Sequence, residues 1–390
     1  MPQLTAPEPF PAAHALFSLD PTMTHLNHGS LGAVPLAVRR AQRQITDTLE
    51  LDPRGFFKNR VPQVTAARVE LAEFIGAPPD STALVTNIVT GVSQVLRALE
   101  LGEGDEVITT DHGYGAVGFN VDAHVRHAGV VHTVAAVPLT PTDEEFVAAV
   151  TDRLTDRTRL VICDQITSAT ARLFPVAKLA AELRERGVAL LVDAAHVPGH
   201  IDADIAGIGA DFWIGNLHKW SFAPRGTAML NVAPRWVEHM SPLMESWKHE
   251  FGFPVATEYN GTDDFTGWLA APSGIALLAE LGLQRVRRHN SQLAHYGQSV
   301  LAAALGTTVE DDAPSPLAMR LVPLPEGVGA TAADSDAIED AVRGELRTEL
   351  TVNTFNGRGI LRLAAQIYNT AADYDRLAER LPGLLKRLGR

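Results

Sequence analysis

Short apolar runs alternate with amphipathic stretches over the first 270 residues or so of the chain. Apolar positions of helical period predict helices at residues 36–51, 62–75, 90–101, 116–127 and 176–186. Short apolar runs predict strands at residues 83–86, 106–110, 130–137, 160–166, 188–192, 210–215 and 227–232. Thr142 and Glu145 have the spacing of a capping box and predict the start of another helix. This alternation predicts an α/β fold with a mostly parallel sheet covered by helices on both faces.

The pattern changes beyond about residue 270. A long helical stretch at 272–305 is followed by separated strands and helices, at residues 319–322, 334–346, 360–364 and 372–388. We therefore expect a large domain over residues 31–265 and a smaller C-terminal α+β domain over residues 266–390. Residues 245–261 are aromatic, contain glycine and have no clear period, so they are predicted to form a long functional loop.

Composition and charge narrow the classes of function. The chain is 46% hydrophobic and 20% charged, which excludes disordered, collagen-like and coiled-coil classes. Its 33 Lys and Arg against 46 Asp and Glu give a net charge of −13, so no partner role for nucleic acid or an anionic membrane is expected. No apolar run approaches the ~18 residues of a spanning helix. No Lys or Arg precedes Arg39, and Cys163 is the one cysteine, so we expect a protein of the cytoplasm.

Two weaker patterns are set aside. Gly113–Gly118 fits G-x-G-x-x-G and follows a predicted strand, but the acid that a dinucleotide site needs at the end of the next strand is missing. The 14 histidines include two pairs with a spacing of three, His25 with His28 and His124 with His127. Neither pair has a cysteine or an obvious carboxylate to complete a ligand set, so no metal site is predicted.

A stronger signal comes from polar residues that follow two apolar strands. Asp193-Ala-Ala-His196 follows the run 188–192, and Asn216-Leu-His-Lys-Trp220 follows the run 210–215. Ligands of open α/β sheets bind at such carboxyl ends. A lysine just past a strand can simply lie at the surface, but Lys219 together with Asp193 has a chemical use. Pyridoxal phosphate needs a lysine amine for its Schiff base and a carboxylate to keep its pyridine nitrogen protonated.

The phosphate of that cofactor needs hydrogen-bond donors, and the turn Thr86–Thr90 supplies them at the predicted start of a helix. Seven motifs occur in one order along the chain, at residues 27–32, 86–90, 111–114, 193–196, 217–220, 261–264 and 361–370. Together they resemble the class V aminotransferase family of fold-type I pyridoxal-phosphate enzymes, in particular its isopenicillin N epimerase branch. The resemblance covers nearly the whole chain and implies that residues 1–30 contribute to the active site.

The resemblance implies a role for each matching residue. Lys219 would form the Schiff base, Asp193 would pair with the pyridinium, and His196 would lie near the phenolic oxygen of the cofactor. Further contacts would come from backbone amides and polar side chains, those of Ile88, Val89, Thr90, Ser168, Asn216 and His218. His112 would stack on the ring face away from Lys219, with Tyr114 as the fallback for that role. Thr262 would reach the phosphate of the partner subunit, which implies a homodimer with shared active sites.

Substrate binding is also implied by the resemblance. Arg362 would hold the α-carboxylate of an amino acid or amino-acid-containing small molecule, a task suited to a planar bidentate donor. Asn27 and His28 would lie on the substrate side. The aromatic residues of the segment 245–261 have two open interpretations, a wall for a bulky side chain or core packing.

Three reaction outcomes remain open after removal of the Cα proton by Lys219. Reprotonation on the opposite face gives epimerisation, which is the expected outcome and needs a second acid/base, for which His112 is the candidate. Transamination and loss of a β-substituent, a C–S lyase reaction, are the alternatives. A persulfide-forming desulfurase is disfavoured, because Cys163 lies inside an apolar run and is expected to be a buried structural thiol.

Two rival classes of function make different predictions. A nicotinamide-dependent oxidoreductase would use Gly113–Gly118, and a non-catalytic protein would keep the fold without the chemistry. The first predicts a colourless protein that forms no Schiff-base absorption with pyridoxal phosphate. The second predicts the absorption band without any exchange of the Cα proton.

Overall fold

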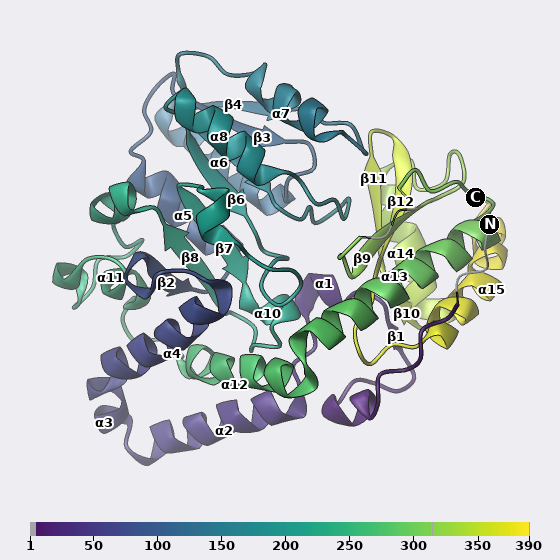
Figure 1. Cartoon of the computed structure of the whole chain (residues 1–390), viewed down its shortest axis with the longest axis horizontal. Coiled ribbons are helices and arrows are strands. Elements are labelled where there is room, and N and C mark those ends of the chain that lie inside the picture. The colour runs from purple at the N-terminus through teal and green to yellow at the C-terminus, as the bar shows by residue number, and fades with distance from the viewer. Residues whose placement is uncertain (1–4, 312, 314, 390) are drawn as a thin grey trace. The chain divides into compact units, whose positions relative to one another are not determined.

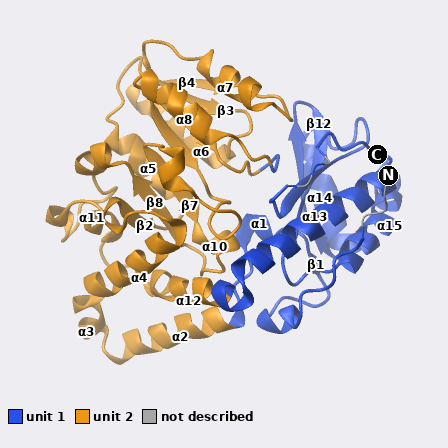
Figure 2. Cartoon of the chain, viewed as in Figure 1, with its two compact units in different colours: residues 1–36, 169–171, 278–390 blue, residues 37–168, 172–277 orange. Residues whose placement is uncertain are grey.

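The computed structural model describes residues 5–311, 313 and 315–389. Its contacts divide the chain into two compact units (Figure 2). Unit 1 comprises Met1–Leu36, Ala169–Ala171 and Leu278–Arg390, and unit 2 comprises Ala37–Ser168 and Arg172–Leu277. Each unit is described by itself. The division into domains at residues 30 and 265 stays a prediction, and the first four residues of its N-terminal segment lie outside the described residues.

Unit 2 is built around a seven-stranded sheet (Figure 1). Its strands follow the spatial order β2-β8-β7-β6-β5-β3-β4 and are β2 Thr82–Val85, β3 Glu106–Thr110, β4 Val131–Ala135, β5 Thr158–Asp164, β6 Ala189–Asp193, β7 Phe212–Asn216 and β8 Ala228–Val232. The strands β7, β6, β5, β3 and β4 are parallel, whereas β8 is antiparallel to both of its neighbours. The short connection from β7 to β8 explains that reversal, because a parallel return needs a longer crossover. The mostly parallel sheet predicted from the sequence is confirmed.

Helices precede, connect and follow these strands. They are α2 Leu36–Leu51, α3 Pro53–Lys58, α4 Arg60–Ile75, α5 Ile88–Ala98, α6 Gly115–Ala128, α7 Asp143–Thr151, α8 Val176–Glu185, α9 Ile205–Ile208, α10 Leu217–Trp220, α11 Val255–Glu258 and α12 Thr266–Leu281, with short 3₁₀ turns η2 Pro79–Ser81, η3 Pro234–His239 and η4 His249–Phe251. Helix α5 packs so closely on β7 that a Cβ at Gly91 would lie 2.8 Å from Ile214. The glycine therefore brings the first turn of α5 close to the strand that precedes Lys219.

The end expected for the first helix, at residue 51, is confirmed, and the structure adds detail to three local predictions. Pro53 does not only end a helix: Asp52 accepts a hydrogen bond from the Gly55 amide at 3.0 Å and caps α3, in which Pro53 takes the first turn. The helix expected from residue 62 begins at Arg60. The segment 245–261 is also not a plain loop, because η4 and α11 lie within it.

Unit 1 has a three-stranded antiparallel sheet in the order β11-β12-β9 and a short parallel pair, β1 with β10. Its elements are η1 Ala13–Leu16, β1 Thr24–His25, α1 His28–Leu31, α13 Leu283–Leu305, β9 Met319–Pro323, α14 Ala332–Leu346, β10 Thr348–Glu349, β11 Thr351–Phe355, β12 Arg358–Ala364 and α15 Ala371–Arg387. The helical stretch predicted at 272–305 is divided between α12 and α13 at Gly282, whose φ of 80° ends the first helix.

Two searches of the described residues bear on other classes of function. No single helix among them is long and apolar enough to cross a membrane, although α12 and α13 pass that test of length and composition as a bent pair. They also contain no group of three or more His, Cys, Asp or Glu side chains that could hold a metal ion.

Candidate active site

Strands β6 and β7 bring the two key residue types to the same edge of the sheet. The strands are neighbours and parallel, so Asp193 at the end of β6 and Asn216 at the end of β7 lie at one carboxyl edge. Lys219 lies within the four-residue helix α10, which follows directly on β7. Asp193 is only 3% exposed and accepts a hydrogen bond from the Ala195 amide at 2.9 Å. The sequence prediction that an acid and a lysine emerge from adjacent strand ends is consistent with this arrangement.

His196 lies between Lys219 and Trp220. Its Nε2 is 3.0 Å from Lys219 Nζ, and the Trp220 indole donates a hydrogen bond to its Nδ1 at 3.3 Å. Because an indole nitrogen only donates, Nδ1 is the acceptor and the neutral ring carries its hydrogen on Nε2, toward the lysine amine. Trp220 was not predicted as a site residue.

The loop that holds His196 is fixed against α10. His200 stacks on the Trp220 ring at 4.2 Å and its Nδ1 lies 3.0 Å from the His196 carbonyl. Gly199 has φ of 82°, and a Cβ there would lie 2.5 Å from the Trp220 carbonyl oxygen. Only glycine permits this approach, so the relative positions of His196 and Lys219 are set by backbone packing.

A second buried acid, Asp164, pairs in register with Asp193 at the end of β5. Burial and the charge of Asp193 raise the pKa of Asp164 well above its usual range, and backbone hydrogen bonds from Ser168 and Tyr114 oppose this. Burial also raises the pKa of Asp193 to about 6, against the Ala195 amide and the charge of Lys219. Two carboxyls this close favour sharing a proton or receiving a positive group. Asp164 was missed because a lone acid after a strand has no distinguishing sequence signal.

The N-terminus of α5 has the expected donors, two of them engaged by side chains. Asn87 caps the helix by accepting a hydrogen bond from the Thr90 amide at 3.0 Å. Asn216 Oδ1 accepts from the Ile88 amide at 3.0 Å, which ties the helix start to the end of β7. The predicted phosphate contacts of Ile88, Val89, Thr90 and Asn216 therefore meet at one place, and an arriving anion would compete with these two amide oxygens.

His218 is hydrogen-bonded to the backbone and carries no charge at pH 7. Its Nδ1 is 2.9 Å from the Thr227 carbonyl and therefore donates to it. Burial lowers the pKa of His218 to about 4, so the ring is neutral at pH 7. The predicted contact of His218 with the cofactor would therefore involve an uncharged ring.

His112 lies just after β3 and is buried. Its Nε2 donates to the Val137 carbonyl at 3.1 Å, and its ring meets the edge of Phe174 at 5.1 Å between centroids. Burial lowers the pKa of His112, which favours the neutral ring with Nδ1 as the basic nitrogen. Tyr114, the fallback for the same role, is 44% exposed and precedes α6.

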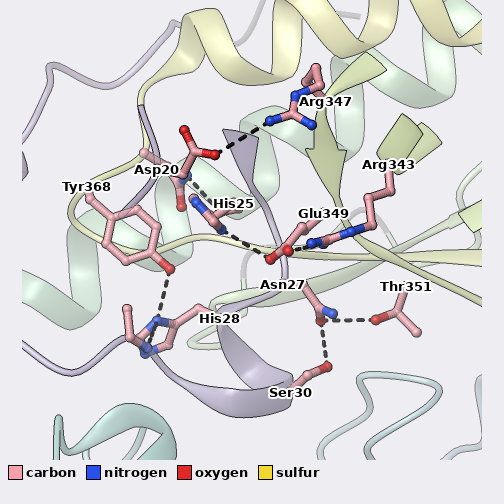
Figure 3. A network of polar contacts seen from close by, with 12 residues as sticks. Asp20, His25, Asn27, His28, Ser30, Arg343, Arg347, Glu349, Thr351 and Tyr368 are labelled. Atoms are coloured by element: carbon pink, nitrogen blue, oxygen red, sulfur yellow. Dashed lines mark hydrogen bonds and ion pairs between the residues drawn. The ribbon is translucent and has the colours of Figure 1, made fainter. Parts of the chain in front are cut away.

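Arg362 belongs to unit 1, where the N-terminal segment holds it. Its Nη2 donates to Asn27 Oδ1 at 2.8 Å, to Ser30 Oγ at 2.6 Å and to Thr351 Oγ1 at 3.2 Å. Ser30 and Thr351 also donate to the same Asn27 oxygen (Figure 3). Burial lowers the pKa of Arg362 to about 10, so the guanidinium remains charged at pH 7. In this unit Asn27 orients Arg362, a role more specific than the predicted one on the substrate side.

His28, the other predicted substrate-side residue of unit 1, pairs with an aromatic hydroxyl. Tyr368 Oη is 3.0 Å from His28 Nδ1 (Figure 3). The Ala33 amide donates to the same nitrogen at 3.4 Å. Nδ1 is therefore an acceptor and Tyr368 the donor. Burial raises the pKa of Tyr368, so the phenol keeps its proton.

The remaining candidates have distinct surroundings. Thr262 is exposed on the loop after Gly261. Of the four aromatic side chains in the segment 245–261, Phe253 is buried and Tyr259 stacks on Arg60. Trp247 and Phe251 are exposed. Cys163 is 1% exposed within β5, and burial raises the pKa of its thiol, which confirms a buried structural cysteine.

The donor set of unit 2 fits a cofactor with a carbonyl, a basic ring nitrogen and a phosphate. Lys219 offers an amine and Asp193 offers a buried carboxylate. The eleven-residue helix α5 offers the amides of its N-terminus. The buried hydroxyls of Thr110 and Ser221, next to this region in sequence, have no hydrogen-bond partner among the described residues. Buried hydroxyls without partners are costly, and a polar ligand would satisfy them.

Comparison with known proteins adds independent information. The family model described as class V aminotransferase matches residues 56–377. Isopenicillin N epimerase of Streptomyces clavuligerus is 32% identical over 386 residues, 94% of this chain and 96% of the relative. A probable chloroplastic L-cysteine desulfhydrase of Arabidopsis thaliana is 28% identical, over 94% of this chain and 84% of the relative.

Solved structures agree on the fold. The cystine C–S lyase C-DES, in complex with its product cysteine persulfide, matches with a TM-score of 0.80 and 21% identity over 92% of this chain and 97% of that one. The cysteine desulfurase of Thermococcus onnurineus matches with a TM-score of 0.78 and 16% identity over 98% of this chain.

Proposed function

Since this chain belongs to the class V aminotransferase family of pyridoxal-phosphate enzymes, we propose that it exchanges the α-proton of an amino acid or an amino-acid-containing small molecule, in the manner of an isopenicillin N epimerase. Family membership confirms the resemblance, the fold-type I architecture, the cofactor and the enzymatic class expected from the sequence. The oxidoreductase alternative built on Gly113–Gly118 finds no support in this family. Transamination and C–S lyase chemistry, the alternative reactions, are also compatible with membership of this family.

One observation carries the proposal: Lys219, His196 and Asp193 meet at one sheet edge. Lys219 Nζ would bond to the carbonyl carbon of the cofactor, and the buried Asp193 carboxylate would hold the pyridine nitrogen in its protonated form. Pyridoxal phosphate, when bound, supplies the electron sink for the electron pair left at Cα. Lys219 Nζ would then take the Cα proton as general base.

His196 would keep this amine in position. The hydrogen on His196 Nε2 points to Lys219 Nζ, so it can be donated to the lone pair of the uncharged lysine amine. The hydrogens of the amine itself stay available for other partners. Trp220, through Nδ1, fixes this choice of tautomer. The arrangement therefore suits an amine that alternates between accepting and giving a proton.

Inversion at Cα needs a second acid/base on the other face, and we assign this role to His112. Replacing His112 by alanine should leave cofactor binding intact and slow inversion, tracked by solvent deuterium, by about 10²-fold or more. His124→Ala, a half-buried histidine on α6, is the matched control and should keep the full rate. Complete inversion in the His112 variant would exclude a two-base mechanism that uses this ring.

The start of α5 links helix stability to phosphate binding. Asn87→Ala removes the cap of α5 and should lower the free energy of unfolding by about 1 kcal/mol, measured by urea denaturation. It should also weaken binding of pyridoxal phosphate, because the first turn that presents the amides is loosened. Asp52→Ala removes the cap of α3 and should cost a similar amount without any change in cofactor affinity. Equal effects of both variants on affinity would contradict the phosphate site.

The substrate and the assembly follow from the same proposal. We assign the α-carboxylate to Arg362, which Asn27, Ser30 and Thr351 orient within unit 1. We also propose a homodimer of the cytoplasm, in which the exposed Thr262 reaches the phosphate of the partner subunit. A desulfurase reaction that transfers sulfur to a cysteine of the enzyme is disfavoured, because Cys163 is buried in β5.

A panel of amino acids, followed at once for α-deuterium uptake, keto-acid formation and thiol release, tests the proposal. Deuterium uptake with inversion and without the other two products is the expected result. Thiol or keto-acid release as the main product would favour the lyase or aminotransferase alternatives. No deuterium uptake with any member of a broad panel, peptides containing an amino acid included, would contradict the proposal.

A further inference from the structure

Arg60 is a buried charge that the mechanism above does not use. It opens α4 and is 1% exposed. Among the described residues no carboxylate lies within ion-pair distance of it, although the charge of Asp263 acts on it from farther away, and its Nη2 is buried without a hydrogen-bond partner. Such a donor costs free energy relative to an apolar side chain of similar size. A stabilising role alone therefore does not explain an arginine here.

The guanidinium is enclosed by the loop that carries Thr262. The rings of Tyr259 and Phe265 lie 3.7 Å and 4.1 Å from the Arg60 carbon Cζ, and both ends of the loop are thereby stacked on it. Between these two rings, Arg60 Nη1 donates to the Gly261 carbonyl at 3.0 Å. Gly261 has φ of 102°, a conformation that only glycine adopts without strain, so this hydrogen bond fixes a backbone turn.

The loop 259–265 is therefore held by its contacts with the guanidinium of Arg60. Thr262, Asp263 and Asp264 are exposed, and Asp264 accepts a hydrogen bond from the Thr266 amide at 2.8 Å, so Arg60 holds the part of the segment that precedes Asp264. Its direction at Thr262 depends on the carbonyl of the preceding residue, which Arg60 holds. A lysine at position 60 keeps the charge but lacks the plane that stacks on both rings and the fork that reaches the carbonyl.

We propose that Arg60 is a positioning residue that holds the loop 259–265 so that Thr262 can bind the phosphate group of the cofactor in the partner subunit. This inference rests on the proposed function, because the role of Thr262 belongs to it. Arg60 itself need not touch the cofactor. Its effect on cofactor binding passes through Thr262, and a double-variant cycle can therefore detect it.

Arg68 provides a matched control on the same helix. It is 4% exposed, and its Nη1 donates to Glu258 Oε2 at 2.8 Å. Glu258 in turn accepts from the Leu84 amide at 2.9 Å, so Arg68 anchors α11 to β2 ahead of the loop. Arg68 is similarly buried but does not contact residues 259–265. Its substitution therefore separates general destabilisation from a loss of loop positioning.

The test measures the Kd of pyridoxal phosphate and the dimer mass for the full-length holoenzyme and four variants. Arg60→Lys and Thr262→Ala should each weaken cofactor binding by about 10-fold, the effect of losing one hydrogen bond to a charged group. The double variant should bind no more weakly than the weaker single variant. Arg68→Lys should lower the melting temperature and leave the Kd within about twofold.

Unchanged affinity in Arg60→Lys, or losses that multiply in the double variant, would overturn the inference. Should Arg60→Lys fail to fold, Tyr259→Leu removes one stacking ring and should show the same dependence on Thr262. The wild-type protein separates this inference from the proposed function. If it binds no cofactor through Lys219, the function fails, whereas a cofactor-loaded wild type with an unaffected Arg60 variant refutes only the role of Arg60.

Discussion

Lys219→Ala should abolish covalent attachment of pyridoxal phosphate and reduce α-proton exchange by on the order of 10⁴-fold. The reason is that one amine has two tasks, bonding to the cofactor and carrying the Cα proton. Lys219 Nζ is the amine placed 3.0 Å from His196 Nε2 at this edge of the sheet. Absorption spectra and deuterium exchange measured on the same preparation report the two losses separately.

Lys178→Ala is the matched control for that substitution. Lys178 is an exposed lysine of unit 2, on α8, whose Nζ lies 2.8 Å from Asp143. Its loss should leave the absorption band and the exchange rate unchanged. Exchange at the wild-type rate in Lys219→Ala, with the protein folded, would show that another group removes the proton.

Asp193→Asn has the second largest expected effect. The amide keeps the shape of the side chain but removes the negative charge that stabilises a protonated pyridine nitrogen, so exchange should fall by about 10²- to 10³-fold. Covalent attachment through Lys219 should persist, because the amine is untouched. Comparing Lys219→Ala with Asp193→Asn therefore separates the loss of the electron sink from the loss of covalent cofactor attachment.

The pH dependence gives an independent check on Asp193. Burial raises the pKa of this carboxyl to about 6, so the cofactor-free protein loses the negative charge as the pH falls through that value. Capture of pyridoxal phosphate should therefore weaken below pH 6 in the wild type and lose this dependence in Asp193→Asn. Asp211→Asn is the control, since Asp211 is similarly buried, at 7% exposed, but precedes β7. A parallel loss of pH dependence in that variant would contradict the assignment.

The sequence predicted those parts of the fold that local patterns encode. Apolar runs flanked by helical periods placed β3, β6 and β8 within one residue of their ends, because each strand is buried on both faces. The pair β1 with β10 could not be predicted, since two-residue strands have no periodicity and their partners are about 320 residues apart in the chain. The end of the first helix at residue 51 was predicted correctly, but α3, which begins at Pro53, was not, because the same proline can end one helix and open the next.

The candidate site shows the same limit. Lys219 and Asp193 were found because their residue types are unusual directly after apolar strands. Trp220 and Arg60 were not found, because a tryptophan or an arginine in sequence gives no sign of what its nitrogen contacts. Their roles depend on a loop from elsewhere in the chain, the His196 loop for one and the residues 259–265 for the other.

The central claim is that Lys219, at the end of β7, holds pyridoxal phosphate. Borohydride reduction of the purified yellow protein, followed by digestion and mass spectrometry, tests it most directly. We predict one modified peptide, carrying the mass of the reduced cofactor on Lys219. A protein that stays colourless with added cofactor, or a label on any lysine other than Lys219, would contradict the account.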